Sequence, residues 1–250
     1  MYEDVFYRKP FLKEVIVRVD FSSPMETLAT KLPAKIGNAA LAHFPVSEPR
    51  KAIAQELQLS AKDIQRKSQE FTEWNYYGRN REKRLVISPL ATFVDYFRYS
   101  TYEMLKEDFL SILSVLFPAF PDLHASRLGL RYINQIELNG VDPFQWNEYI
   151  NNGLLGLFER FTDREHIRRL FNIAEFNFDD MQIKFQFGAP NPDFPAPIRR
   201  PFFVLDIDAY FQGLQEFGDI SANIDRAHDR IQTLFEESIT DRLREVMNDE

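Results

Sequence analysis

Two aspartates, Asp206 and Asp208, are the residues of this sequence that most resemble a metal site. They are one residue apart in a segment that reads as a strand, where residues i and i+2 point to the same face. Paired carboxylates can hold Mg²⁺ for phosphoryl or nucleotidyl transfer. In the alternative, Leu205 and Ile207 face the core and the aspartates face water, as strand alternation alone predicts. Because no glycine-rich phosphate loop with its lysine accompanies the pair, the sequence favours this alternative.

Two basic groups are candidates for ligand binding. The first surrounds a Gly-Arg-Asn sequence typical of a hairpin tip, and its members are Arg79, Arg81, Lys83 and Arg84. The second precedes a later pair of predicted strands, and its members are Arg164, Arg168 and Arg169. Arginines in such groups can bind phosphates while nearby aromatic side chains stack on bases. The alternative is a set of charged, solvated hairpin ends that bind nothing.

Three polar residues interrupt apolar patterns. His228 lies on the apolar stripe of the last predicted helix, where it could be a general base or a core residue satisfied by its neighbours. Arg131 and Asn134 lie on an otherwise apolar strand and need long-range partners, such as Asp95 or Glu175. For all three residues the patterns favour structural roles.

The remaining residue types argue against an enzyme. The chain has no cysteine, which excludes disulfides, thiolate metal sites and cysteine nucleophiles. Its other histidines, His43, His124 and His166, do not have the spacing of metal ligands, and no Gly-x-Ser-x-Gly motif is present. We therefore expect a protein without a cofactor.

Composition indicates a globular protein with a sheet-rich core. Hydrophobic residues make up 44% of the 250 residues, and the 24 Phe and 10 Tyr favour strands. Neither a signal peptide nor an apolar run of membrane-spanning length is present, so we expect a cytoplasmic protein that does not enter membranes. The net charge of −8 implies that nucleic acid could bind only through a local basic patch.

The predicted elements occur in a repeated order. The first series is a strand at 13–21, a helix at 24–43 that Pro33 should kink or split, four strands between 52 and 99, and a helix at 100–117. The second series is a strand at 127–138, a helix at 142–161, strands at 166–178, 181–187 and 202–211, and a helix at 220–247. Residues 188–201 contain five prolines and should form a loop that either connects strands or binds.

This order predicts an α+β protein made by tandem duplication of a β-α-β(3–4)-α unit. The halves are residues 1–120 and 121–250, packed as one globular unit. Each half is expected to be an antiparallel sheet with long helices packed on one face, in helix-grip or TATA-binding-protein-like order. Such an element order does not specify a function.

Four stretches of the chain resemble one protein family. They are Pro10-Phe-Leu-Lys-Glu-Val15, Gly129-Leu-Arg-Tyr-Ile-Asn134, Leu205-Asp-Ile-Asp208, and His228 followed by Phe235-Glu236 and Ile239-Thr240-Asp241. Together they resemble a sporadically distributed family of bacterial proteins of unknown function, about 250 residues long. The resemblance spans nearly the whole chain and implies no activity, cofactor or site residue. Patchy occurrence implies an accessory component of a multi-gene system, such as antiviral defence.

Three functions therefore stay open. The first is a non-enzymatic binding or interaction protein, an accessory component of a bacterial multi-gene system whose partner is another protein encoded nearby. The second is a binder of a small ligand or nucleotide in a cavity between helix and sheet. The third is a metal-dependent phosphotransfer enzyme that uses Asp206 and Asp208. The missing catalytic motif favours the first.

Overall fold

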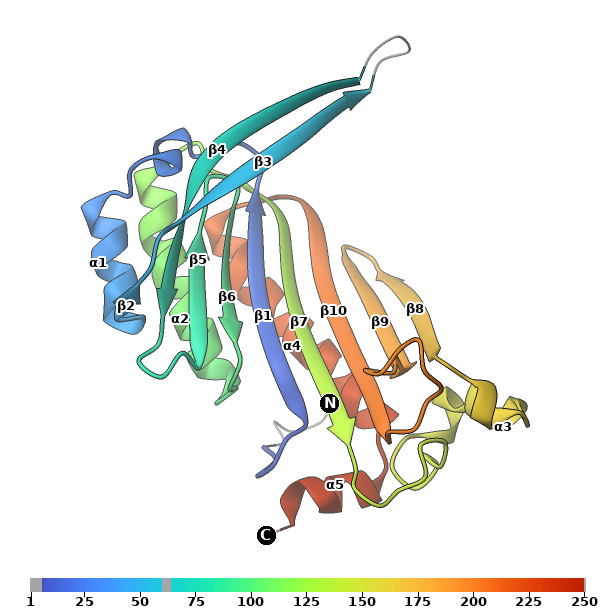
Figure 1. Cartoon of the computed structure of the whole chain (residues 1–250). Helices are drawn as coiled ribbons and strands as arrows, with labels where there is room; N and C mark the ends of the chain where they lie inside the picture. The colour runs from blue at the N-terminus through green and yellow to red at the C-terminus, as the bar shows by residue number, and fades with distance from the viewer. Residues whose placement is uncertain (1–5, 60–63, 250) are drawn as a thin grey trace. The chain divides into compact units, whose positions relative to one another are not determined.

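The computed structural model describes residues 6–59 and 64–249, and its main feature is a ten-stranded sheet (Figure 1). The strand order is β2-β4-β5-β6-β1-β7-β10-β9-β8, and β3 pairs with β4. The strands are β1 (Leu12–Phe21), β2 (Val46–Ser47), β3 (Arg50–Leu59), β4 (Ile64–Tyr77), β5 (Lys83–Ile87), β6 (Ala91–Tyr96), β7 (Ala125–Glu137), β8 (Leu170–Phe178), β9 (Met181–Ala189) and β10 (Phe202–Gln215). The helices are η1 (Glu26–Ala29), α1 (Ala34–His43), α2 (Tyr102–Ala119), η2 (Asn152–Leu154), α3 (Gly156–Arg160), η3 (Arg164–His166), α4 (Phe217–Ser238) and α5 (Asp241–Asn248).

The fold class predicted from the sequence is wrong. Strands account for 37% of the structure and helices for 32%, so the antiparallel sheet dominates and the helix-grip or TATA-binding-protein-like arrangement of long helices on one face does not hold. The expected helix at 142–161 is replaced by turns and the short helices η2 and α3. Asp142 Oδ1 accepts a hydrogen bond from Phe144 N in a local turn, and the following asparagines and glycines have low helix propensity.

The expected last helix is also divided. Ile239 forms an isolated bridge with Ile150, and Thr240 begins α5 by accepting a hydrogen bond from Leu243 N through its side chain. A residue that pairs as a strand cannot keep helical backbone hydrogen bonds, so α4 ends at Ser238.

Other local predictions are confirmed. Pro33 divides the expected 24–43 helix, because it stands as the N-cap of α1 behind η1. Asp179, with a φ of 54°, lies in the tight turn between β8 and β9, as aspartate tolerates left-handed backbone. The expected helix at 100–117 is α2, and its N-cap is Thr101, whose side chain accepts a hydrogen bond from Met104 N.

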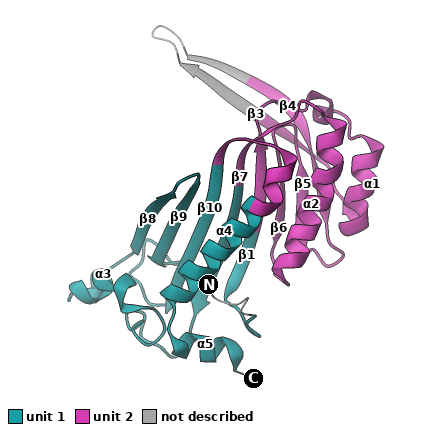
Figure 2. Cartoon of the chain, turned by 180° about the vertical axis from the view of Figure 1, so that it is seen from behind, with its two compact units in different colours: residues 1–15, 129–211, 223–250 teal, residues 16–128, 212–222 magenta. Residues whose placement is uncertain are grey.

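The chain divides into two compact units, which are described separately (Figure 2). Unit 1 comprises Met1–Val15, Gly129–Phe211 and Asn223–Glu250, and unit 2 comprises Ile16–Leu128 and Gln212–Ala222. Each unit therefore contains segments from both sides of residue 120.

The core of unit 1 lies between α4 and the sheet. The part of α4 after Asn223 lies across one face of β7 and β10 (Figures 1 and 2). Alternate residues of the strands and one stripe of the helix are buried: Ile183, Phe185, Phe203, Leu205, Ile207, Ile224 and Ile231. Each such side chain contributes about 1.5–3 kcal/mol by leaving water.

The core of unit 2 lies under α1 and α2, which lie side by side (Figures 1 and 2). The buried faces of both helices and of β5 supply the fully buried side chains Ile36, Leu85, Ile87, Leu105, Phe109 and Ile112. The buried residues of α2 recur at helical spacing, as the sequence predicted for an amphipathic helix, whereas Leu85, Val86 and Ile87 of β5 are all buried.

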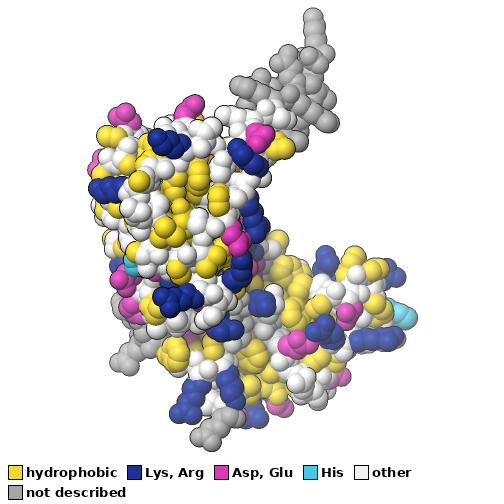
Figure 3. Space-filling view, turned by 60° about the vertical axis from the view of Figure 1, so that its left-hand side comes forward, with side chains coloured by type: hydrophobic (Ala, Val, Ile, Leu, Met, Phe, Trp, Pro, Cys, Tyr) yellow, Lys and Arg dark blue, Asp and Glu magenta, His cyan; other side chains and the backbone are white. Residues whose placement is uncertain are grey.

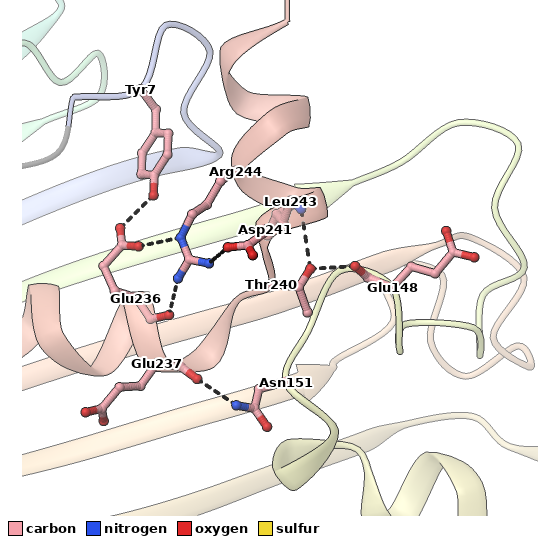
Figure 4. A network of polar contacts seen from close by, with 9 residues as sticks. All are labelled: Tyr7, Glu148, Asn151, Glu236, Glu237, Thr240, Asp241, Leu243 and Arg244. Carbon is pink, nitrogen blue, oxygen red and sulfur yellow. Dashed lines mark hydrogen bonds and ion pairs between the residues drawn. The ribbon is translucent and has the colours of Figure 1, made fainter.

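A polar network holds the junction of α4 and α5 in unit 1 (Figure 4). Glu236, which is 3% exposed, accepts hydrogen bonds from Tyr7 Oη at 2.7 Å and from Arg244 Nε at 2.9 Å. Arg244 also donates to the Glu236 carbonyl at 2.6 Å and to Asp241 Oδ1 at 2.8 Å. Burial and the Glu236 carboxylate raise the pKa of the Tyr7 hydroxyl. The network joins the segment before β1 to both C-terminal helices.

Removing the charge of Glu236 should destabilise the protein. Glu236→Gln leaves the Arg244 guanidinium with only the exposed Asp241 carboxylate, and we expect the loss of the charged hydrogen bonds to Glu236 to cost about 2 kcal/mol. Denaturant titration measures the free energy of unfolding. The matched control is Glu237→Gln. The Glu237 side chain is exposed, and the hydrogen bond from Asn151 goes to the Glu237 backbone carbonyl, which the substitution keeps. Equal stability of the two variants would show that the network contributes nothing.

Candidate functional site

The first basic group lies at the turn between β4 and β5 in unit 2. Arg81 forms an ion pair with Glu48 and stacks 4.7 Å over the Tyr77 ring. Hydrogen bonding from Arg81 lowers the pKa of the Glu48 carboxylate. Arg79 is exposed and has no ion pair with any described residue. Arg79 and Arg81 thus lie at the surface, and Arg81 is already paired with Glu48.

Lys83, although part of this basic group, is turned into unit 2. Its side chain is 12% exposed, and Nζ lies 2.5 Å from Asp108 Oδ2 and 4.7 Å from the Phe44 ring centroid. Tyr96 Oη donates to the same carboxylate oxygen at 2.5 Å, and His43 Nδ1 lies 2.8 Å from Oδ1. Burial and the bond to Asp108 raise the pKa of the Tyr96 hydroxyl. The carboxylate is therefore the centre of a buried cluster that joins α1, α2, β5 and β6.

Arg84 also forms an ion pair with a carboxylate. Its Nη2 donates to Asp95 Oδ2 at 2.9 Å, and its guanidinium lies 5.4 Å from the centroid of Phe93. Asp95 is 1% exposed. The suggested pairing of Asp95 with Arg131 is therefore wrong, because register places Asp95 directly opposite Arg84 on the neighbouring strand.

The partner of Arg131 is Asp206, one of the two predicted metal ligands. Arg131 Nε donates to Oδ1 at 2.8 Å and Nη2 to Oδ2 at 2.6 Å, which is a bidentate ion pair. The hydrogen bonds to Asp206 raise the pKa of Arg131. Asp206 is buried and Asp208 is half-buried on the same face of β10. Among the described residues no group of three or more His, Cys, Asp or Glu could hold a metal ion.

His228 is a core residue, as the structural interpretation predicted. It is 8% exposed, and its Nδ1 lies 3.0 Å from Tyr132 Oη. Asn134, on the same strand as Tyr132, donates to the Leu205 carbonyl at 3.5 Å. These contacts join α4, β7 and β10 and satisfy the polar groups of a packed interior.

The second basic group lies in unit 1, before the first residue of β8: Arg164, Arg168 and Arg169. The segment packs against the proline-rich loop, where Ile198 N donates to the Ile167 carbonyl at 2.8 Å. Arg168 and the loop residue Arg199 are both exposed, and neither has an ion pair in the described part of the chain. The backbone pairing brings these two segments together.

Arg169 is held in one orientation. Its Nε donates to the Pro190 carbonyl at 3.0 Å, and its guanidinium lies 4.3 Å from the centroid of the Phe194 ring. That ring is itself 52% exposed. Arg164, by contrast, lies 5.9 Å from the Phe144 ring, away from these contacts.

Asn191 organises the loop that carries Phe194 and Arg199. It is 6% exposed and has a φ of 59°, which asparagine tolerates. Its Nδ2 donates to the carbonyls of Arg168 at 2.8 Å and Ala196 at 2.7 Å, and its Oδ1 accepts from Asp193 N at 3.1 Å. One side chain thus fixes both ends of the turn.

We call Arg168, Arg169, Phe194 and Arg199 the loop surface. The sequence predicted Arg168 and Arg169 as binding residues but did not identify Phe194, Arg199 or Asn191. The high proline content of 188–201 was the available signal, because it predicted a loop that either connects strands or binds.

Two roles of Asp206 can be distinguished by experiment: a Mg²⁺ ligand together with Asp208, or the ion-pair partner of Arg131. Asp206→Asn should lower the free energy of unfolding by about 1–2 kcal/mol, with or without Mg²⁺ or Mn²⁺, because it removes the paired hydrogen bonds to Arg131, whose side chain is 38% exposed and can turn to water. Asp208→Asn is the matched control on the same strand face and should have a smaller effect. Thermal melts measure both. A metal-dependent rise in melting temperature that Asp208→Asn abolishes would instead support a metal site.

The role of Asn191 predicts a local loss of order. Asn191→Ala removes three side-chain hydrogen bonds, worth about 1 kcal/mol each. We expect faster cleavage by trypsin after Arg199, measured by mass spectrometry of timed digests. Asn177→Ala, an exposed position on β8, is the control. Unchanged cleavage in Asn191→Ala would mean that the loop is held by other contacts.

Comparison with known proteins does not place this chain in a family. No family model matches it, and no curated protein matches it. Within residues 6–59 and 64–249, none of the helices is both long enough and apolar enough to cross a membrane. The resemblance to a sporadic bacterial family stays a prediction.

Proposed function

We propose that this chain is a non-enzymatic, cytoplasmic binding protein, an accessory component of a bacterial multi-gene system such as antiviral defence. Its partner in this proposal is another protein encoded nearby, and its binding surface is the loop surface of unit 1. The observation that carries the proposal is the pair of exposed residues Arg168 and Arg199, which lack ion pairs in the described residues and lie on two segments joined by backbone and Asn191 hydrogen bonds.

The two basic groups differ in how many of their members are already paired with carboxylates of the described chain. In the first group, three of the four members already bind carboxylates of unit 2. In the loop surface, no arginine does so within the described chain. Arginine is enriched in the residues that dominate protein interfaces, because its planar fork forms several directed hydrogen bonds. The loop surface is therefore the better candidate for a partner.

Order in the loop supports the same conclusion. Binding costs conformational entropy whenever a loop or a long side chain must be immobilised. Here the Asn191 hydrogen bonds and the prolines restrict the backbone, and Pro190 and Phe194 restrict Arg169. A surface that is ordered before binding keeps more of its contact energy as affinity.

The internal use of the buried carboxylates supports a role without catalysis. Asp108 is bound by Lys83 and Tyr96, and Asp206 by Arg131. A carboxylate fixed in this way serves packing, since its lone pairs are occupied by groups of the chain itself.

Affinity purification from the native host, with the neighbouring genes intact, tests the proposal. The wild-type chain should retain a stoichiometric partner protein, and the double variant Arg168→Glu/Arg199→Glu should lose it. Arg79→Glu is the matched control, because Arg79 is also exposed and unpaired in the described chain but belongs to unit 2. Recovery of the wild-type chain alone, or retention of the partner by the double variant, would contradict the proposal.

A further inference from the structure

We infer that the loop surface recognises an acidic peptide segment, and that Arg169 binds one of its carboxylates with both terminal nitrogens. This inference rests on the proposed function, because it specifies what the partner protein presents. It adds a chemical class of ligand and assigns separate roles to Arg169, Phe194 and the pair Arg168 and Arg199.

The geometry of Arg169 leaves one edge of the guanidinium available. Nε is used by the Pro190 carbonyl, and one face of the plane is covered by the Phe194 ring. No contact with a described residue uses Nη1 or Nη2. Two parallel N–H groups in a fixed plane match the two oxygens of a carboxylate, and such paired hydrogen bonds are among the strongest polar contacts in proteins.

Arg168 and Arg199 add charge beside this fork. Arg168 adjoins Arg169, and Arg199 follows Ile198, whose backbone pairs with Ile167. Their side chains are exposed and unpaired among the residues described, so they can meet further acidic side chains of the same segment. In this proposal Arg169 recognises the planar carboxylate through paired hydrogen bonds. Arg168 and Arg199 add electrostatic attraction, which should weaken as the salt concentration rises.

Phe194 supports Arg169 and also offers an apolar contact. One side of its ring lies under the guanidinium, while 52% of the residue stays exposed. An aromatic ring in this position can pack against an apolar side chain that follows the carboxylate in the ligand. The surface therefore fits a short segment of mixed acidic and apolar character.

The charge distribution favours a short peptide over a nucleic-acid strand. Asp163, Glu165 and Asp193 are exposed acidic residues interleaved with the arginines of this region. On the face seen in Figure 3, basic and acidic side chains are likewise interleaved. A nucleic-acid strand carries a phosphate at every nucleotide, and these acidic residues would repel some of those phosphates. A short segment with two or three carboxylates can bind by contacting only the arginines that lie within a Debye length of about 8 Å.

Fluorescence anisotropy with two labelled probes tests the inference on the full chain. The probes are hexaglutamate peptide and oligothymidylate, measured at physiological ionic strength. Hexaglutamate should bind, and oligothymidylate should bind more weakly. If oligothymidylate binds more tightly and depends on Phe194, the surface is a nucleic-acid site and the inference is overturned.

Variants of Arg169 separate geometry from charge. Arg169→Ala should weaken hexaglutamate binding about tenfold, as expected for loss of a charge-assisted pair. Arg169→Lys keeps the charge without the fork and should remain several-fold weaker than wild type. Arg79→Ala should bind like wild type, and thermal melts confirm that each variant is folded. Wild-type affinity in Arg169→Lys would overturn the assignment of the fork.

Failure of this inference can be told apart from failure of the proposed function. If the native partner is lost in Arg168→Glu/Arg199→Glu while hexaglutamate binding does not depend on Arg169, the surface binds a protein but not through an acidic segment. If the partner is retained in the double variant, the proposed function fails whatever the peptide shows.

Discussion

Buried carboxylates impose the constraint on which the rest of the structure depends. Four acidic side chains of the described residues lie in the interior: Asp95, Asp108, Asp206 and Glu236. Each forms an ion pair with a lysine or arginine, and these partners are Arg84, Lys83, Arg131 and Arg244, respectively. An ionised carboxylate removed from water without such a partner costs several kcal/mol. The pairings therefore decide which basic residues are structural and which remain at the surface for a ligand.

These pairs also connect elements that sequence distance separates. Arg131 and Asp206 are 75 residues apart and join β7 to β10. Asp108, on α2, receives Lys83 from β5, Tyr96 from β6 and His43 from α1. A wrong strand register in either unit would leave one buried carboxylate unpaired. The free-energy cost of that charge disfavours the wrong register more strongly than the loss of apolar packing would alone.

Local signals in the sequence predicted much of the secondary structure and little of the arrangement. Alternation identified β1, β7 and β10, and Asp179 marked the β8–β9 turn, because strand period and turn chemistry depend on adjacent residues. The strand order could not be obtained in this way, since it depends on hydrogen bonds between distant segments. The assumed repeat of helices failed where Asp142 formed a turn and where Ile239 paired with Ile150.

The same distinction explains the binding residues. A cluster of arginines is visible in a sequence, but whether each guanidinium is free depends on carboxylates that only folding brings near. Lys83 and Arg84 looked like surface charges until β6 and α2 supplied Asp95 and Asp108. The loop surface differs because Asn191 and backbone carbonyls hold much of its loop, and the ion pair that this loop does form joins Glu137 to Arg200, which is not one of the loop-surface arginines. Because Glu137 pairs with Arg200 and a backbone carbonyl receives Arg169 Nε, no carboxylate of the described chain occupies Arg168 or Arg199, and both can bind a ligand.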